Sequence, residues 1–204
     1  MTTKDHWDNI YTTKPPTQVS WYQAHARLSL EFIQRAGLAP GDPIIDVGGG
    51  ASTLVDDLLA AGYQAVTVLD LSAAALAAAR QRLGAAGAPV TWLVADVTDA
   101  DLPAHTYALW HDRAVFHFLT QPADRQRYVA QVRRAVRPGG HVIVATFAPD
   151  GPERCSGLAV ARYSPESLHG EFGAEFQLVE SAREAHQTPL GAEQKFIYCY
   201  CRRR

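Results

Sequence analysis

The fold is decided by the stretch 44–52, which reads Ile44-Ile45-Asp46-Val47-Gly48-Gly49-Gly50-Ala51-Ser52. An apolar run here ends in an acid and three glycines, and a helix-forming stretch, 52–61, follows. A strand, a glycine turn and a helix in this order are typical of the first unit of an α/β fold. Because glycine has no Cβ and a helix N-terminus offers free N–H groups, a ligand can approach the backbone closely at this turn.

Short β-branched runs and helical stretches alternate from residue 43 onward, which predicts a largely parallel sheet with helices between its strands. The predicted strands are 43–47, 65–69, 90–94, 107–111, 141–147, 176–185 and 194–201. The last two are expected to pair as a hairpin. The predicted helices are 5–11, 22–36, 52–61, 73–83, 124–136 and one that starts at Ser164-Pro165-Glu166. Pro138-Gly139-Gly140 is expected to form a turn, and 149–162 a long loop.

Length and composition predict one domain over 1–204, with an N-terminal helical cap or lid (1–38) on a core (39–204). The net charge of -2 gives no reason to expect a nucleic-acid partner. No apolar run approaches the ~20 residues needed to cross a bilayer, so no membrane partner is expected. Three cysteines in a chain of this size favour reduced thiols and a cytoplasmic location. Whether the protein is a monomer or a dimer is left open.

The residues around the glycine turn narrow the choice of ligand. A nicotinamide dinucleotide fingerprint requires a third glycine where this chain has Thr53. Asp46, which precedes the glycines, suits a ligand with a cationic amine and would repel a pyrophosphate. Adenosylmethionine carries such an amine.

Two more acids follow the second and third predicted strands. Asp70 lies 20 residues beyond Gly50, a spacing at which a carboxylate can accept hydrogen bonds from both ribose hydroxyls. Asp96 follows the third strand and could accept a hydrogen bond from an adenine amino group. The alternative is that each acid is a turn or cap residue, as is common where strands lead into helices.

These residues resemble the motifs of the class I, Rossmann-like S-adenosylmethionine-dependent methyltransferases over about residues 40–201. The resemblance rests on 44–50, Leu69-Asp70-Leu71-Ser72, Ala95-Asp96-Val97 and Arg137-Pro138-Gly139-Gly140. Ser52 replaces the third glycine of the family's motif. The resemblance implies a seven-stranded, mostly parallel sheet with an antiparallel last strand and helices on both faces. It also implies a cofactor site made of Asp46, Gly48, Gly49, Gly50, Ser52, Asp70, Leu71, Asp96, Val97, His111 and Trp21.

The resemblance places His111-Asp112-Arg113, at the end of the fourth strand, beside the transferred methyl group. Methyl transfer requires alignment, exclusion of water and, for some acceptors, a base. Candidates for that base are His111, Asp112, Arg113 and His117. The alternative is that Asp112 caps a following helix and that His117 is a packing histidine with its hydrogen bonds satisfied. Residues expected near the acceptor are Trp7, Tyr11, Tyr22, Phe116, Cys155 and His186.

The expected activity is methyl transfer from S-adenosylmethionine to a sulfur, nitrogen or metalloid atom of a small molecule. Some lysine-specific methyltransferases share the N-terminal Trp and Tyr pattern, so a protein lysine is the alternative acceptor. A protein that binds the cofactor without catalysis is the alternative from another class.

Cys199 and Cys201 point to one face of a strand, but no matching ligands stand nearby and no metal site is expected.

Overall fold

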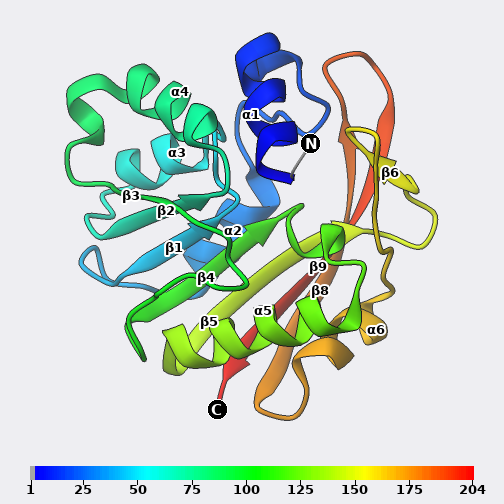
Figure 1. Cartoon of the computed structure of the whole chain (residues 1–204). Coiled ribbons are helices and arrows are strands. Elements are labelled where there is room, and N and C mark those ends of the chain that lie inside the picture. Colours follow the sequence, from blue (N-terminus) through cyan, green and yellow to red (C-terminus); the bar gives the residue numbers. More distant parts are fainter. Residues whose placement is uncertain (1–2) are drawn as a thin grey trace.

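The computed structural model describes residues 3–204 and contains a seven-stranded sheet with the strand order β3-β2-β1-β4-β5-β9-β8 (Figure 1). Its strands are β1 (Ile44–Val47), β2 (Val66–Asp70), β3 (Thr91–Val94), β4 (Tyr107–Arg113), β5 (Val136–Phe147), β8 (Phe176–Gln187) and β9 (Glu193–Arg203). β1 to β5 run parallel, and β9 is antiparallel to both β5 and β8. The predicted sheet with an antiparallel last strand is therefore confirmed.

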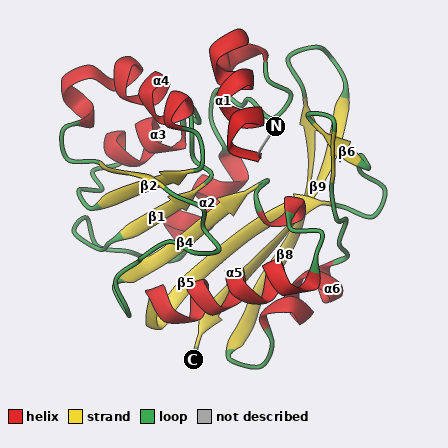
Figure 2. Ribbon diagram, in the orientation of Figure 1, coloured by secondary structure: helices red, strands yellow, loops and turns green. Residues whose placement is uncertain are grey.

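Helices cover both faces of the sheet (Figure 2). They are α1 (Thr3–Thr13), α2 (Arg27–Arg35), α3 (Leu54–Ala60), α4 (Ala73–Leu83), α5 (Pro122–Ala135) and α6 (Pro165–Phe172), with 3-10 turns η1 (Pro16–Gln18), η2 (Gly84–Gly87) and η3 (Phe116–Phe118). The apolar side chains form two buried clusters. One gathers α5 and α6 against the sheet, and the other gathers α2, α3 and α4. Burial on both faces explains why β1 does not alternate between apolar and polar residues: all four of its residues are buried, and Asp46 is the charged exception among apolar ones.

Three elements differ from the sequence prediction. The helix expected over 22–36 is shorter, because residues 22–26 form irregular backbone before α2. The turn expected at Pro138-Gly139-Gly140 lies inside β5, where the pairing with β4 shifts register and Gly139 has a φ of +75°. The long loop 149–162 contains a small hairpin, β6 (Arg154–Cys155) and β7 (Leu158–Ala159).

α1 lies over the carboxyl ends of the strands, between α4 and the β6 hairpin (Figure 1). Its Asp8 carboxylate accepts a hydrogen bond from the Ser72 hydroxyl at 2.6 Å, and Ser72 is the N-cap of α4. The separation of a cap (1–38) from a core (39–204) in one domain stays a prediction. No helix within residues 3–204 has the length and apolar character that a membrane span requires.

Candidate functional site

The site lies where the strand order reverses. From β1 the chain proceeds outward to β2 and β3, whereas β4 and β5 lie on the other side of β1. In open α/β sheets, such a switch point leaves a crevice at the carboxyl ends of the two central strands. The turn after β1 and the last residue of β4 both face this crevice.

Two cavities open there, and they share five wall residues. The larger, about 850 Å³ with its solvent-open part, is lined by Thr3, Trp7, Tyr11, Trp21, Val47, Gly48, Leu69, Asp70, Leu71, Ala95, Asp96, Val97, Arg113, Ala114, Val115, Phe118, Leu119 and Cys155. The smaller is lined by Tyr11, Pro16, Val19, Trp21, Tyr22, Gln23, Ala26, Asp46, Val47, Gly48, Gly49, Ala51, Ser52, Leu54, His111 and Arg113. The shared wall is Tyr11, Trp21, Val47, Gly48 and Arg113.

The glycine turn is closely packed on the protein side. Gly48 has a φ of +66°, and a Cβ there would overlap Cγ2 of Val115. A Cβ on Gly49 would overlap the Asp46 carboxylate, and one on Gly50 would lie 2.7 Å from Oδ2 of Asp70. Each glycine thus lets a neighbouring side chain approach the backbone. All the predicted cofactor residues except Gly50 line one of the two cavities.

Asp46 and His111 are register partners on β1 and β4. Oδ1 of Asp46 lies 2.7 Å from Nδ1 of His111, and Nε2 of His111 lies 2.8 Å from the Ser29 hydroxyl. Oδ2 of Asp46 is buried and has no hydrogen-bond partner in the described part of the chain. A buried carboxylate oxygen without a partner is costly, and a ligand cation in the smaller cavity would satisfy it.

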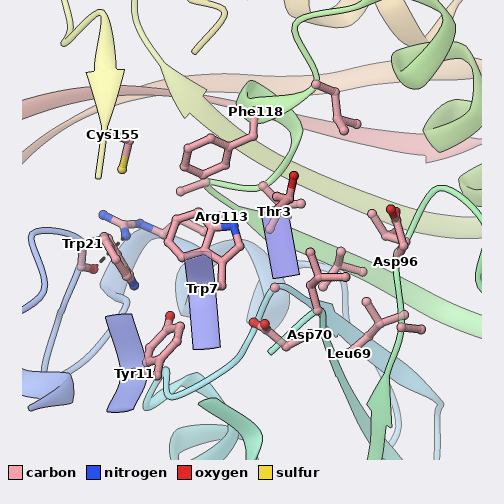
Figure 3. A pocket seen from close by; sticks show the side chains of 18 residues that line it. Thr3, Trp7, Tyr11, Trp21, Leu69, Asp70, Asp96, Arg113, Phe118 and Cys155 are labelled. Carbon is pink, nitrogen blue, oxygen red and sulfur yellow. Dashed lines mark hydrogen bonds between the residues drawn. The ribbon is translucent and has the colours of Figure 1, made fainter. Parts of the chain in front are cut away.

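Asp70 and Asp96 lie on the wall of the larger cavity, at the ends of β2 and β3 (Figure 3). Burial raises the pKa of Asp70 to about 7, and the negative charges of Asp46 and Asp8 act in the same direction. Oδ1 of Asp70 accepts the backbone N–H of Ser72. Oδ1 of Asp96 accepts two hydrogen bonds from Thr98, at 2.7 and 2.8 Å.

Aromatic side chains fill the other end of the larger cavity, where Trp7, Trp21, Tyr11 and Phe118 gather around Arg113 (Figure 3). The Trp7 ring centroid lies 5.7 Å from that of Trp21 and 5.1 Å from that of Phe118, both edge to face. Thr3, Trp7 and Tyr11 follow each other at four-residue spacing and therefore share one face of α1. That spacing could have identified Thr3 from the sequence.

The structure does not support Asp112 and His117 as residues facing the transferred methyl group, since neither lines a cavity. Asp112 is fully buried and accepts hydrogen bonds from the backbone N–H groups of Val115 and Phe116 and from the Tyr128 hydroxyl. It caps the 3-10 turn η3 after β4, in place of the helix that the alternative interpretation expected. Burial lowers the pKa of His117 to about 3, and neither ring nitrogen has a hydrogen-bond partner among the described residues.

Three residues predicted near the acceptor lie elsewhere or behave differently. Phe116 is in the buried core, where its ring packs edge to face with that of Tyr128. His186 bonds to the carbonyl oxygen of Ser20 at 2.8 Å and lines neither cavity. Cys155 does line the larger cavity, but burial raises the pKa of its thiol to about 12.

Several other wall residues could not be identified from the sequence. Val115, Phe118 and Leu119 belong to the irregular segment around η3, which has no periodic pattern to identify them. Ala114 has a φ of +76°, a conformation that is strained for a residue with a Cβ and is frequent at functional sites.

Comparisons with known proteins agree on one family. Residues 44–140 match the family model described as a methyltransferase domain. The eEF1A lysine and N-terminal methyltransferase of Mus musculus is 22% identical over 150 residues, which is 71% of this chain but 21% of that protein. The chain thus spans about a fifth of that relative's length. The ubiquinone biosynthesis O-methyltransferase of Aromatoleum aromaticum is 29% identical over 198 residues, covering 96% of this chain and 74% of that one.

Solved structures share the fold over nearly the whole chain. One, described as showing the conversion of a disulfide bond into a thioacetal group during echinomycin biosynthesis, superposes with a TM-score of 0.77 at 21% identity. It covers 99% of this chain and 92% of that one. The phosphoethanolamine N-methyltransferase 2 of Haemonchus contortus, in complex with S-adenosyl-L-methionine, has a TM-score of 0.75 at 15% identity, covering 100% of this chain and 60% of that one. The domain match, together with the sheet order and the cavities at its switch point, shows that the chain contains a methyltransferase domain with the fold of the class I S-adenosylmethionine-dependent methyltransferases.

Proposed function

We propose that the protein transfers the methyl group of S-adenosylmethionine to a nucleophilic atom of a small molecule. When bound, the cofactor supplies an electrophilic methyl group on a cationic sulfur. The observation that carries the proposal is the junction of the two cavities at Gly48. A ligand with two polar ends can span both cavities there, with its reactive centre at the shared wall.

The residues present fit this cofactor in the smaller cavity. The unpartnered Oδ2 of Asp46 is an acceptor for an ammonium group. The other oxygen of this carboxylate is held by His111, whose second ring nitrogen bonds to Ser29. The backbone of Gly48 and Gly49 can be approached closely because neither carries a side chain. We assign the methionine end of the cofactor to this cavity.

The adenosyl end fits the larger cavity. Asp70 can accept hydrogen bonds from ribose hydroxyls, and Asp96 can accept one from the adenine amino group. Leu71 and Val97 supply apolar walls beside these acids. The aromatic side chains of Trp7 and Trp21 exclude water at the opposite end, where the acceptor would bind.

A protein lysine is the second candidate acceptor, because one relative is named as a lysine and N-terminal methyltransferase. The small molecule is favoured because α1 and the β6 hairpin both contribute to the cavity wall, through Trp7 and Cys155. Such an enclosed wall suits a compact acceptor better than a side chain on a folded protein.

The test has two steps. Calorimetry should detect S-adenosylmethionine binding to the wild-type chain and a severe loss of affinity in Asp70→Ala; equal affinities would remove the proposed cofactor placement. The chain is then incubated with cofactor carrying a labelled methyl group and a cell lysate. Label in the small-molecule fraction supports the proposal, and label in a protein fraction supports the lysine alternative. Binding without any labelled product would indicate a non-catalytic cofactor-binding protein.

A further inference from the structure

Building on the proposed methyl transfer, we propose that the acceptor is an organic anion, a thiolate or a carboxylate on an apolar body, and that Arg113 binds it. Arg113 is the last residue of β4 and belongs to the wall that both cavities share. Among the described residues lining the larger cavity, it is the one cation.

Hydrogen bonds to three other residues hold the guanidinium of Arg113 in place. Its Nε donates to the Tyr198 hydroxyl, Nη1 donates to the carbonyl oxygen of Trp21, and Nη2 donates to Oε2 of Glu184, each at 3.1 Å. The group also lies 4.3 Å from the centroid of the Phe196 ring. A guanidinium has five N–H donors, so these three bonds leave two for a ligand. A fixed fork with two free donors matches a carboxylate or another anion.

The counter-ion of Arg113 does not face the ligand. Glu184 lies on β8 and lines neither cavity. Its Oε1 accepts the side-chain amide of Gln23 at 3.0 Å, and its Oε2 also accepts the Tyr198 hydroxyl at 3.3 Å. These bonds occupy the carboxylate on the far side of the guanidinium. A ligand in the cavity would therefore contact the guanidinium of Arg113, whereas the Glu184 carboxylate only holds this guanidinium in place.

Within the described part of the chain, no side chain at the acceptor end of the cavity is suited to removing a proton. No histidine from residues 3–204 lines the larger cavity, and the thiol of Cys155 stays neutral because burial raises its pKa to about 12. Asp96 lies at the other end, and Asp70 is the residue assigned above to the ribose (Figure 3). A protonated amine would thus keep its proton, whereas an anion has none to lose.

The change of charge during methyl transfer also favours an anionic acceptor. An anionic acceptor supplies the electron pair of the new bond to carbon, and the carbon–sulfur bond breaks with its pair left on sulfur. The negative charge of the acceptor and the positive charge on sulfur cancel in this step. An amine acceptor would instead develop positive charge close to Arg113, in a cavity where screening by water is weak.

The test uses three probes with one phenylpropyl frame: 3-phenylpropanoate, 3-phenylpropanamide and 3-phenylpropylamine. Each is titrated by calorimetry into the protein saturated with S-adenosylhomocysteine. The anion is expected to bind about tenfold or more tightly than the amide, as a charge-assisted pair of hydrogen bonds predicts, and the amine more weakly still. A carboxylate that binds no better than its amide overturns the proposal, whatever the variants do.

Variants and a transfer assay complete the test. Arg113→Met is expected to remove the preference for the anion, and Arg113→Lys to keep part of it because the charge remains. Benzenethiolate and benzoate are then compared with aniline as acceptors of a labelled methyl group, which separates the thiolate from the carboxylate; preferred methylation of aniline contradicts the proposal. Failure to bind S-adenosylhomocysteine at all would count against the proposed function itself. Normal cofactor binding without a preference for the anion would contradict the anionic acceptor but leave the proposed methyl transfer standing.

Discussion

At Gly48 the backbone has a φ of +66°, and the place of a Cβ is already occupied by Val115. Gly37 has the same φ of +66° but open space around it. Alanine at Gly37 should cost about 1–2 kcal/mol of stability, because an L-residue is strained in this conformation. Alanine at Gly48 should cost more, because its Cβ would also overlap Val115. Gly48→Ala should in addition lose cofactor binding in calorimetry, while Gly37→Ala keeps it. Equal affinities in both variants would contradict a cofactor role for the turn.

Asp70 predicts a pH dependence of cofactor binding. Burial raises its pKa to about 7, so the carboxyl group is largely protonated at pH 6 and ionised at pH 8. Ribose hydroxyls that donate to the carboxylate favour the ionised form. Affinity for S-adenosylmethionine should therefore rise from pH 6 to pH 8. Asp70→Asn cannot titrate and should bind weakly with a flatter profile; a profile identical in shape to that of the wild type would refute the assignment.

The sequence allowed the acids Asp46, Asp70 and Asp96 to be identified because each is a charged residue at or near the end of an apolar run. It could not indicate the roles of Asp112 and Arg113, which are neighbours on β4 with opposite orientations. Asp112 turns inward to cap the backbone of η3, and Arg113 turns toward the cavities. The partner that fixes Arg113, Glu184, is 71 residues away along the chain, and no local pattern connects the two.

At the scale of elements, Asp8 ties α1 to the N-terminus of α4. Asp8 accepts hydrogen bonds from the Ser72 hydroxyl at 2.6 Å and the backbone N–H of Ala74 at 3.4 Å, so its charge lies at the N-terminus of α4. Because Trp7 and Tyr11 are on the same helix, cofactor exchange requires α1 to move. Asp8→Ala should speed the release of S-adenosylhomocysteine about tenfold, as loss of a charged hydrogen bond predicts.

The matched control is Asn9→Ala, a change at the next, exposed position of α1. Stopped-flow measurement of tryptophan fluorescence gives the release rate for both variants. If Asp8→Ala and Asn9→Ala release the product equally fast, α1 is not held by Asp8.

Elements with regular apolar patterns were predicted well, since the strands β1 and β2 and the helix α4 lie close to their expected ranges. The segments that build the acceptor end were not, because residues 22–26, η3 and the β6 hairpin owe their shape to contacts with the rest of the protein. Ala161, for example, donates its N–H to the carbonyl oxygen of His117, which ties the hairpin segment to η3.

For the whole molecule, ligand binding should appear as thermal stabilisation. A ligand that binds only the native state, at a hundred times its Kd, adds about 2.7 kcal/mol, which corresponds to roughly 5–10 °C for a chain of this size. S-adenosylhomocysteine should raise Tm by this amount. A nicotinamide dinucleotide should not, because Asp46 repels a pyrophosphate and Thr53 replaces the required glycine. A comparable shift with the dinucleotide would mean that the turn binds another cofactor.

The anchoring of Arg113 by β8 and β9 also sets the order in which the site is completed during synthesis. The glycine turn, Asp70 and Asp96 emerge from the ribosome early, and β4 follows. Glu184 is made 71 residues after Arg113, which takes roughly 4–14 s at ordinary rates of translation. Until β8 and β9 have emerged, the growing chain lacks the contacts of Arg113 with Glu184, Phe196 and Tyr198. A nascent chain can therefore carry the acids of the cofactor site before it has the means to select an acceptor.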